Sequence, residues 1–152
     1  MERLLLKQQL YQACVQQLSG RLEQLELRFA DLDAALTQET KSSVGDKYET
    51  GRAMIHLERD KLQQQKAVII QQQQQLAAID ASQSTPVAGL GSVVLTNQQA
   101  FYLAIGVGKI SVDKAIYYAL TGASPVGQLL WNKKAGDAFE FRGKAYQVLE
   151  VF

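Results

Sequence analysis

The sequence lacks most of the residues on which metal centres, disulfide frameworks and common hydrolytic sites are built. It has one cysteine, Cys14, and one histidine, His56, among 152 residues. A single cysteine excludes an intramolecular disulfide, and the two residues are too few for a zinc site of Cys and His ligands. We interpret Cys14 as a small buried residue and His56 as a partly exposed helix residue, which leaves no nucleophile–histidine–acid set.

A strong net charge and long apolar runs are also absent. The 16 Lys and Arg residues are balanced by 15 Asp and Glu residues. This balance argues against bulk electrostatic capture of nucleic acid or of an anionic membrane. No stretch approaches 18 apolar residues, and the N-terminal apolar run is too short for a signal peptide. We therefore expect a cytoplasmic protein with no membrane partner.

Proline and glycine are scarce in the first half of the chain. Both prolines, Pro86 and Pro125, and most glycines follow residue 80, whereas the preceding part is rich in Gln, Leu, Glu, Lys and Ala, all compatible with helix. The polar segment 81–86 ends in proline, which is typical of a linker. We predict a helical part at 1–80, a linker at 81–86 and a domain of another class at 87–152.

Two apolar stripes in the first part predict an antiparallel helical hairpin, a coiled coil with arms at 2–40 and 47–80. Spacings of four and three relate Leu18, Leu22, Leu25, Phe29, Leu32 and Leu36. Spacings of seven relate Ile55, Leu62, Ile69 and Leu76, with Val68 and Ile79 as reinforcement. The only helix-breaking stretch lies between them, so the tip is expected at about 40–47. Each arm would be about 50–60 Å long and would project from the body.

The second part has the pattern of a small α+β domain with an antiparallel, strongly bent sheet. Strands are predicted near 91–96, 101–106, 115–120, 137–142 and 145–151, with turns at Gly136 and at Arg142-Gly143. A helix of one or two turns is predicted to start at Pro125, with Ser124 as its N-cap. Trp131, at the end of this helix, is either a core residue or an interface anchor.

The hairpin tip carries the residues of greatest chemical interest. Asp46 and Glu49 are three positions apart, which places both carboxylates on one helix face if the second arm begins at about 46. Two carboxylates form an oxygen-rich half-site for Mg²⁺ that needs further ligands from elsewhere. Lys41, Lys47 and Arg52 surround the same tip and could contact a phosphate backbone.

A structural interpretation of the same residues stays open. Asp46 is a good N-cap, and Glu49 at the third following position would complete an arrangement like a capping box. Ser43 with Asp46 is a second candidate for that role. Acidic side chains in a first helical turn also complement the helix dipole.

Three stretches of the sequence resemble the Gre family of bacterial transcript-cleavage factors. Residues 124–137, SPVGQLLWNKKAGD, are similar to the family's SPxGxALLGKKxGD signature. Residues 138–152 match its closing strand pair, and Gly45, Asp46 and Glu49 match the glycine, aspartate and glutamate of its GDLxEN tip segment. The resemblance spans nearly the whole chain, and it implies an FKBP-like fold for the C-terminal domain.

The resemblance also implies a function. The hairpin of the family enters the secondary channel of RNA polymerase, where tip carboxylates help to hold the second catalytic Mg²⁺ and a water. The polymerase then cleaves the 3′ end of backtracked RNA and resumes elongation. Asp46 and Glu49 would be the metal-positioning pair, and Ser124, Pro125 and Trp131 would dock on the polymerase. The protein would be a monomeric elongation factor with no catalytic activity alone and no Mg²⁺ of its own.

Other functions stay open because the tip departs from the family pattern. Lys47 replaces a leucine, and residues 50–56, which begin with Thr50, Gly51 and Arg52, stand in place of the family's NAEYxAA continuation. The runner-up is therefore an inhibitor or competitor that binds the same channel without stimulating cleavage. A prolyl isomerase and a coiled-coil dimerisation protein are two further alternatives from other classes.

Overall fold

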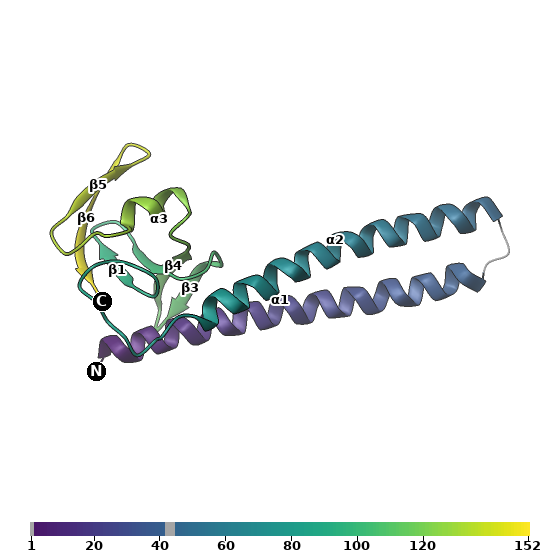
Figure 1. Cartoon of the computed structure of the whole chain (residues 1–152), viewed down its shortest axis with the longest axis horizontal. Coiled ribbons are helices and arrows are strands. Elements are labelled where there is room, and N and C mark those ends of the chain that lie inside the picture. Colours follow the sequence, from purple (N-terminus) through teal and green to yellow (C-terminus); the bar gives the residue numbers. More distant parts are fainter. Residues whose placement is uncertain (1, 42–44) are drawn as a thin grey trace. The chain divides into compact units, whose positions relative to one another are not determined.

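The computed structural model describes residues 2–41 and 45–152, without the side chains of 39–41 and 45–49 (Figure 1). Two long helices, α1 (Glu2–Lys41) and α2 (Gly45–Ala77), come first. Six strands follow, with the short helix α3 (Pro125–Leu130) between the fourth and the fifth. The chain is therefore α+β, with a helical region before a sheet, as the sequence predicts. None of the helices described is both long and apolar enough to cross a lipid bilayer.

The six strands form one mixed sheet in the order β3-β4-β2-β1-β6-β5. The strands are β1 (Val93–Thr96), β2 (Ala100–Leu103), β3 (Gly108–Val112), β4 (Ala115–Leu120), β5 (Ala138–Phe141) and β6 (Lys144–Val151). Four neighbouring pairs are antiparallel, but β2 and β4 are parallel, with Ala100 opposite Tyr117. The prediction of a purely antiparallel sheet is therefore wrong. The reason is that β3 forms a hairpin with β4 at the edge, so β4 returns beside β2 in the same direction.

Strand β3 is absent from the sequence prediction, which placed no strand between 106 and 115. Gly106 lies in the connection after β2, whereas Gly108 begins β3 with a φ of +82°. In β3 the buried Ile110 and Val112 alternate with the exposed Lys109 and Ser111. This alternation is the pattern of a half-buried strand, so the sequence carries a signal for β3 that the prediction missed.

The chain divides into two compact units, and each is described separately. One unit is Leu18–Gln72, which consists of parts of α1 and α2. The other unit joins Met1–Gln17 to Gln73–Phe152, so it contains the first turns of α1 as well as the whole sheet. We call these the hairpin unit and the sheet unit.

In the hairpin unit the two helices lie side by side and antiparallel (Figure 1). Leu25, Phe29, Leu62 and Ile69 are at most 7% exposed, so both predicted stripes are buried at these positions. Val68 is 54% exposed, and its predicted place in the second stripe is wrong. One residue is 100° of helix turn, which carries Val68 away from the face that Ile69 presents to α1.

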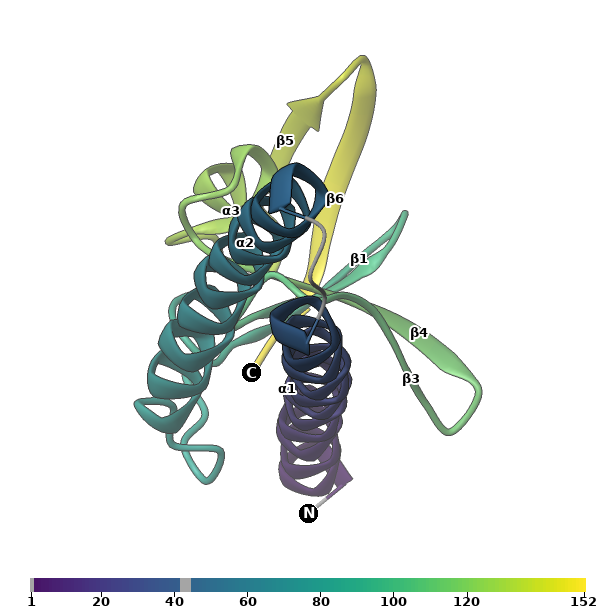
Figure 2. The same ribbon diagram turned by 90° about the vertical axis from the view of Figure 1, so that its right-hand side faces the viewer.

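In the sheet unit, both faces of the sheet are covered. Phe101 and Leu103 of β2 pack on one face with Leu130 of α3. Side chains alternate along a strand, so Tyr102 points to the other face, where it lies near Tyr11 and Cys14 of α1. Figure 2 shows α3 and the N-terminal part of α1 beside the sheet.

Polar contacts join the first turns of α1 to the rest of the sheet unit. The Gln17 side-chain amide donates to the Val107 carbonyl at 3.2 Å, and the buried Lys7 ammonium donates to the Gln83 carbonyl. Near the start of the helix, Arg3 forms an ion pair with Glu150 and lies over the ring of Phe152. These contacts reach the connection before β3, the 81–86 segment and the end of β6.

The β5–β6 hairpin confirms the predicted turn at Arg142-Gly143. Both residues have positive φ, at +53° and +79°, as a two-residue turn of type I′ requires. Across the hairpin, the rings of Phe139 and Tyr146 stack with centroids 4.9 Å apart. Glycine at the second turn position and an aromatic cross-strand pair therefore fix the register.

Candidate functional site

The backbone places the predicted tip carboxylates at the start of the second long helix. Helix α1 ends at Lys41 and α2 begins at Gly45, so Asp46 and Glu49 belong to its first turns, three positions apart. This start lies one residue before the predicted 46, and it puts Asp46 inside the helix. The side chains of Asp46 and Glu49, and those of Lys41 and Lys47, lie outside the described residues. Their predicted roles stay predictions.

Arg52 is the one predicted tip residue whose side chain is described. It lies in α2, three positions after Glu49, and it is half-buried. Arg52 also takes part in an interaction within the protein.

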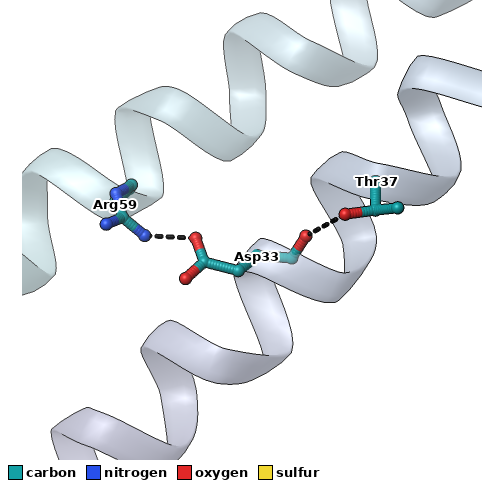
Figure 3. A network of polar contacts seen from close by, with 3 residues as sticks. All are labelled: Asp33, Thr37 and Arg59. Carbon is teal, nitrogen blue, oxygen red and sulfur yellow. Dashed lines mark hydrogen bonds and ion pairs between the residues drawn. The ribbon is translucent and has the colours of Figure 1, made fainter.

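A cluster of five side chains, here called the Phe29 clasp, joins the two helices in the hairpin unit. Its members are Glu26, Phe29 and Asp33 on α1 and Arg59 and Lys66 on α2. Lys66 pairs with Glu26 at 2.8 Å, and Arg59 pairs with Asp33 (Figure 3). The two cations lie over the Phe29 ring, with Arg59 Cζ 5.2 Å and Lys66 Nζ 5.8 Å from its centroid. Cations at this range are attracted to the ring face.

Two further polar contacts lie next to the clasp. The Thr37 hydroxyl donates to the Asp33 backbone carbonyl at 3.0 Å, one helical turn back (Figure 3). Towards the tip end of α2, Arg28 donates to Glu58 at 2.9 Å in a third pair between the helices. The side chains of this third pair are 53% and 40% exposed. The two ion pairs of the clasp are exposed to a similar degree, and pairs of this kind each contribute about 0–1 kcal/mol. The clasp differs in that both of its cations also lie over the Phe29 ring.

The described residues hold no preformed metal centre. No group of three or more His, Cys, Asp or Glu side chains comes together in the part of the chain whose side chains are described. The two tip carboxylates fit Mg²⁺ in donor chemistry, because oxygen ligands are the ones that this ion prefers. Their number does not complete a coordination shell. They therefore fit a half-site that waters and a second macromolecule would finish.

In the sheet unit, the predicted start of the short helix is confirmed. The Ser124 hydroxyl accepts a hydrogen bond from the Gly127 amide at 3.1 Å, as an N-cap does, and Pro125 is the first residue of α3. The Ser124 hydroxyl also donates to the Thr121 carbonyl at 2.7 Å. Both of its hydrogen-bonding capacities are thus used inside the protein. The backbone of Ser124 is used in the same way, because its amide donates to the Thr121 carbonyl and its carbonyl accepts from the Gln128 amide. Ser124 therefore shapes this loop.

Trp131 borders an apolar pocket of about 650 Å³ in the sheet unit. The pocket is lined by Gln75, Ala78, Leu90, Ala104, Thr121, Gly122, Ala123, Gln128 and Trp131. Trp131 is 40% exposed and Leu90 is 55% exposed, which favours the interface anchor over the core residue. Two large apolar side chains are thus exposed to solvent at the same pocket. Such an exposed apolar surface is suited to binding. We call it the Trp131 pocket.

Gly122 lets the indole of Trp131 take its position. A Cβ atom on Gly122 would lie 2.8 Å from two ring carbons of Trp131, closer than real Cβ atoms approach. Sequence reasoning identified Trp131 but missed Gly122, Leu90 and Gln128. These residues come from separate loops and helix ends, and nothing in their spacing signals that they meet.

Burial changes the pKa values of two groups on the face of the sheet that α1 covers. Desolvation raises the pKa of the Cys14 thiol from 9.0 to about 12. It also raises the pKa of Tyr102, whose hydroxyl has no hydrogen-bond partner among the described residues. Both groups stay neutral at physiological pH. A buried thiol of high pKa is a poor nucleophile, in agreement with a structural role for Cys14.

Comparisons with known proteins add no family assignment. No family model matches the chain, and the curated proteins contain no match either. The resemblance carried by residues 45–49 and 124–152 therefore stays a prediction.

Proposed function

We propose that this protein is an RNA polymerase-binding elongation factor of the Gre type, whose tip carboxylates stimulate cleavage of backtracked RNA. One observation carries the proposal. Two long helices are joined at a tip, and Asp46 and Glu49 lie in the first turns of the second helix, α2. An incomplete oxygen site at such a position has a use only if another macromolecule completes it. The channel of a polymerase would accept two helices side by side, about 20 Å across.

In this proposal each residue at the tip has a defined task. Asp46 and Glu49 would hold Mg²⁺ jointly with polymerase carboxylates, and the bound ion would supply activation of the attacking water. Lys41, Lys47 and Arg52 would face the RNA phosphates. The protein contributes ligands and position, and the polymerase carries out the cleavage, so the protein is not an enzyme by itself.

The sheet unit would provide the docking. We propose an FKBP-like identity for it, in which the loop of Ser124 and Pro125 and the Trp131 pocket contact the polymerase. The exposed indole beside an apolar hollow supports this assignment, because tryptophan is enriched among residues that dominate binding energy. Docking through one unit and chemistry through the other would let binding and cleavage be changed separately.

The test is a cleavage assay on a backtracked elongation complex of the cognate polymerase. Asp46→Ala and Glu49→Ala together should reduce stimulated cleavage at least about 100-fold, with polymerase affinity changed less than about threefold. Trp131→Ala should weaken polymerase binding at least about tenfold. Leu149→Ala, at a still more exposed apolar residue of β6 (57% against 40% for Trp131), should leave binding and cleavage unchanged. Unchanged cleavage in the carboxylate double variant would contradict the site.

A second candidate is an inhibitor or competitor in the same channel. It is favoured by Gly51, which lies within α2 only two positions after Glu49 and costs helix stability by up to about 1 kcal/mol relative to alanine. If Gly51 weakens the start of α2 in this way, Asp46 and Glu49 are held less firmly. Slower nucleotide addition without stimulated cleavage, measured on the same complex, would identify this function.

A further inference from the structure

We infer that the Phe29 clasp sets the axial register of α2 against α1 and thereby positions Asp46 and Glu49 for cleavage. The inference rests on the proposed function, and it assigns positioning roles to five residues outside the tip. Asp46 precedes Arg59 by 13 residues, so the clasp acts on the tip over about 20 Å of helix. None of the five residues would touch the reacting atoms.

The spacing of the clasp explains why it holds a single register. Glu26 and Asp33 are seven residues apart on α1, and Arg59 and Lys66 are seven residues apart on α2. Seven residues are nearly two helical turns, so each pair faces the same way. Because the helices are antiparallel, the first acid meets the second base and the second acid meets the first. Phe29 lies between the acids and meets both cations.

Apolar packing between α1 and α2 specifies the register less firmly than the clasp does. The stripe on α1 repeats leucine or phenylalanine every three or four residues, so a slip by one turn brings apolar residues opposite apolar residues again. The same slip would separate both ion pairs of the clasp and remove a cation from Phe29. Polar groups that are satisfied in only one alignment fix the register of coiled coils in this way.

The register decides which residues form the start of α2. Only residues 42–44 separate the two helices. A slip of one turn would therefore have to unwind residues from one helix and add residues to the other. If the start of α2 unwinds, the three-residue spacing no longer places both carboxylates on one face. If α2 is extended instead, positions 46 and 49 move by about one turn, or about 5.4 Å, along the hairpin. Displacements of about 1 Å already cost catalysis about 100-fold in well-positioned sites.

Charge reversal tests the inference. Asp33→Arg and Arg59→Asp, made singly, should lower the maximal cleavage rate at saturating factor at least about tenfold. The factor concentration that gives half-maximal cleavage should change less than about twofold, because the proposed docking residues lie in the other unit. The double variant Asp33→Arg/Arg59→Asp restores a pair of opposite charge and should recover the rate to within about threefold. The matched control is the single reversal Arg28→Glu, in the ion pair with Glu58 outside the clasp, which should change the maximal rate less than about twofold.

A distance measurement gives a readout that is independent of cleavage. Spin labels on cysteines at Gln38 and Ala53, in a Cys14→Ala background, report the alignment of the two helices. Each single reversal should shift or broaden the distance distribution by about 5 Å, the rise of one turn, and the swap should restore it. Unchanged distances in the single variants, or changed distances with full cleavage, would overturn the inference. A wild-type protein that stimulates no cleavage would overturn the proposed function instead, and the distances would then decide the role of the clasp in setting the register.

Discussion

Gly127 in α3 occupies a position that admits no side chain. A Cβ atom there would lie 2.0 Å from the Thr121 carbonyl oxygen and 2.7 Å from the Ser124 hydroxyl oxygen. The Thr121 carbonyl is held in place, because it accepts hydrogen bonds from both the amide and the hydroxyl of Ser124. The glycine of the SPVG segment is therefore required by the geometry of the cap.

We predict that Gly127→Ala lowers the free energy of unfolding by about 3 kcal/mol, since the loop must move to admit the methyl group. Urea denaturation followed by circular dichroism measures this change. Gly106→Ala is the matched control: no heavy atom lies within 4 Å of its added Cβ, and it should cost less than about 1 kcal/mol. Equal effects of the two substitutions would contradict the steric explanation.

Cys14 gives a pH dependence of stability whose sign follows from its burial. Its pKa is raised from 9.0 to about 12 in the folded protein, so between these values the unfolded chain loses the thiol proton and the folded chain keeps it. The unfolded state then binds fewer protons, and stability falls as the pH rises through 9. The stabilising effect of the neutral thiol is fully present below pH 9.

We therefore predict that raising the pH from 8 to 10 destabilises the wild-type protein by about 1 kcal/mol more than it destabilises Cys14→Ala. Urea unfolding of both proteins at both pH values gives the comparison, in which shifts of other groups cancel. The native thiol should also resist a maleimide reagent at pH 8. Rapid labelling, or parallel pH profiles for the two proteins, would show that Cys14 is accessible.

At the scale of elements, the long helices follow from their sequence far better than the sheet does. The stripe that contains Leu25 and Phe29 repeats over many turns, so single exceptions do not obscure it. Val68 was misplaced because apolar character alone does not distinguish the buried face from the position 100° away. The pairing of β2 with β4 joins segments whose order in space depends on β3, and no local pattern records such a pairing.

The candidate sites also differ in how far the sequence alone predicts them. Asp46 and Glu49 could be identified from their spacing, because both belong to one helix. The Phe29 clasp has regular spacing on each helix, but only the register of the two helices shows which acid meets which base. The Trp131 pocket collects residues from 75 to 131, and its lining depends on the complete fold of the sheet unit.

The apolar seam between α1 and α2 yields a prediction at this scale. Leu62 is fully buried, whereas Leu57, five residues earlier on the same helix, is 64% exposed. Leu62→Ala should lower the free energy of unfolding by about 2–4 kcal/mol, because it removes a buried side chain and leaves a cavity. Leu57→Ala should change it by less than about 1 kcal/mol. Similar losses from both would mean that α2 presents a different face to α1.

At the scale of the whole molecule, the sheet unit depends on the first turns of α1. Leu10 and Cys14 are fully buried, and so are Val93 and Tyr102 of the sheet. Removal of residues 1–17 would expose the face of the sheet that carries Tyr102, together with the Val107 carbonyl that Gln17 contacts. A large exposed apolar face makes a fragment prone to aggregation. The C-terminal residues alone should therefore not form a stable domain.

Two chains test this dependence. The fragment 81–152 should aggregate or unfold without a cooperative transition, although it contains every strand. A permuted chain that joins residue 152 to residue 2 through a short Gly/Ser linker, and so runs 73–152 and then 2–17, should fold cooperatively. The join is short because Arg3 Cζ lies 5.5 Å from the centre of the Phe152 ring. Size-exclusion chromatography and urea unfolding distinguish the two. A cooperative, monomeric 81–152 fragment would show that the α1 turns cover the sheet without stabilising it, and the boundary near residues 81–86 would then be the better description.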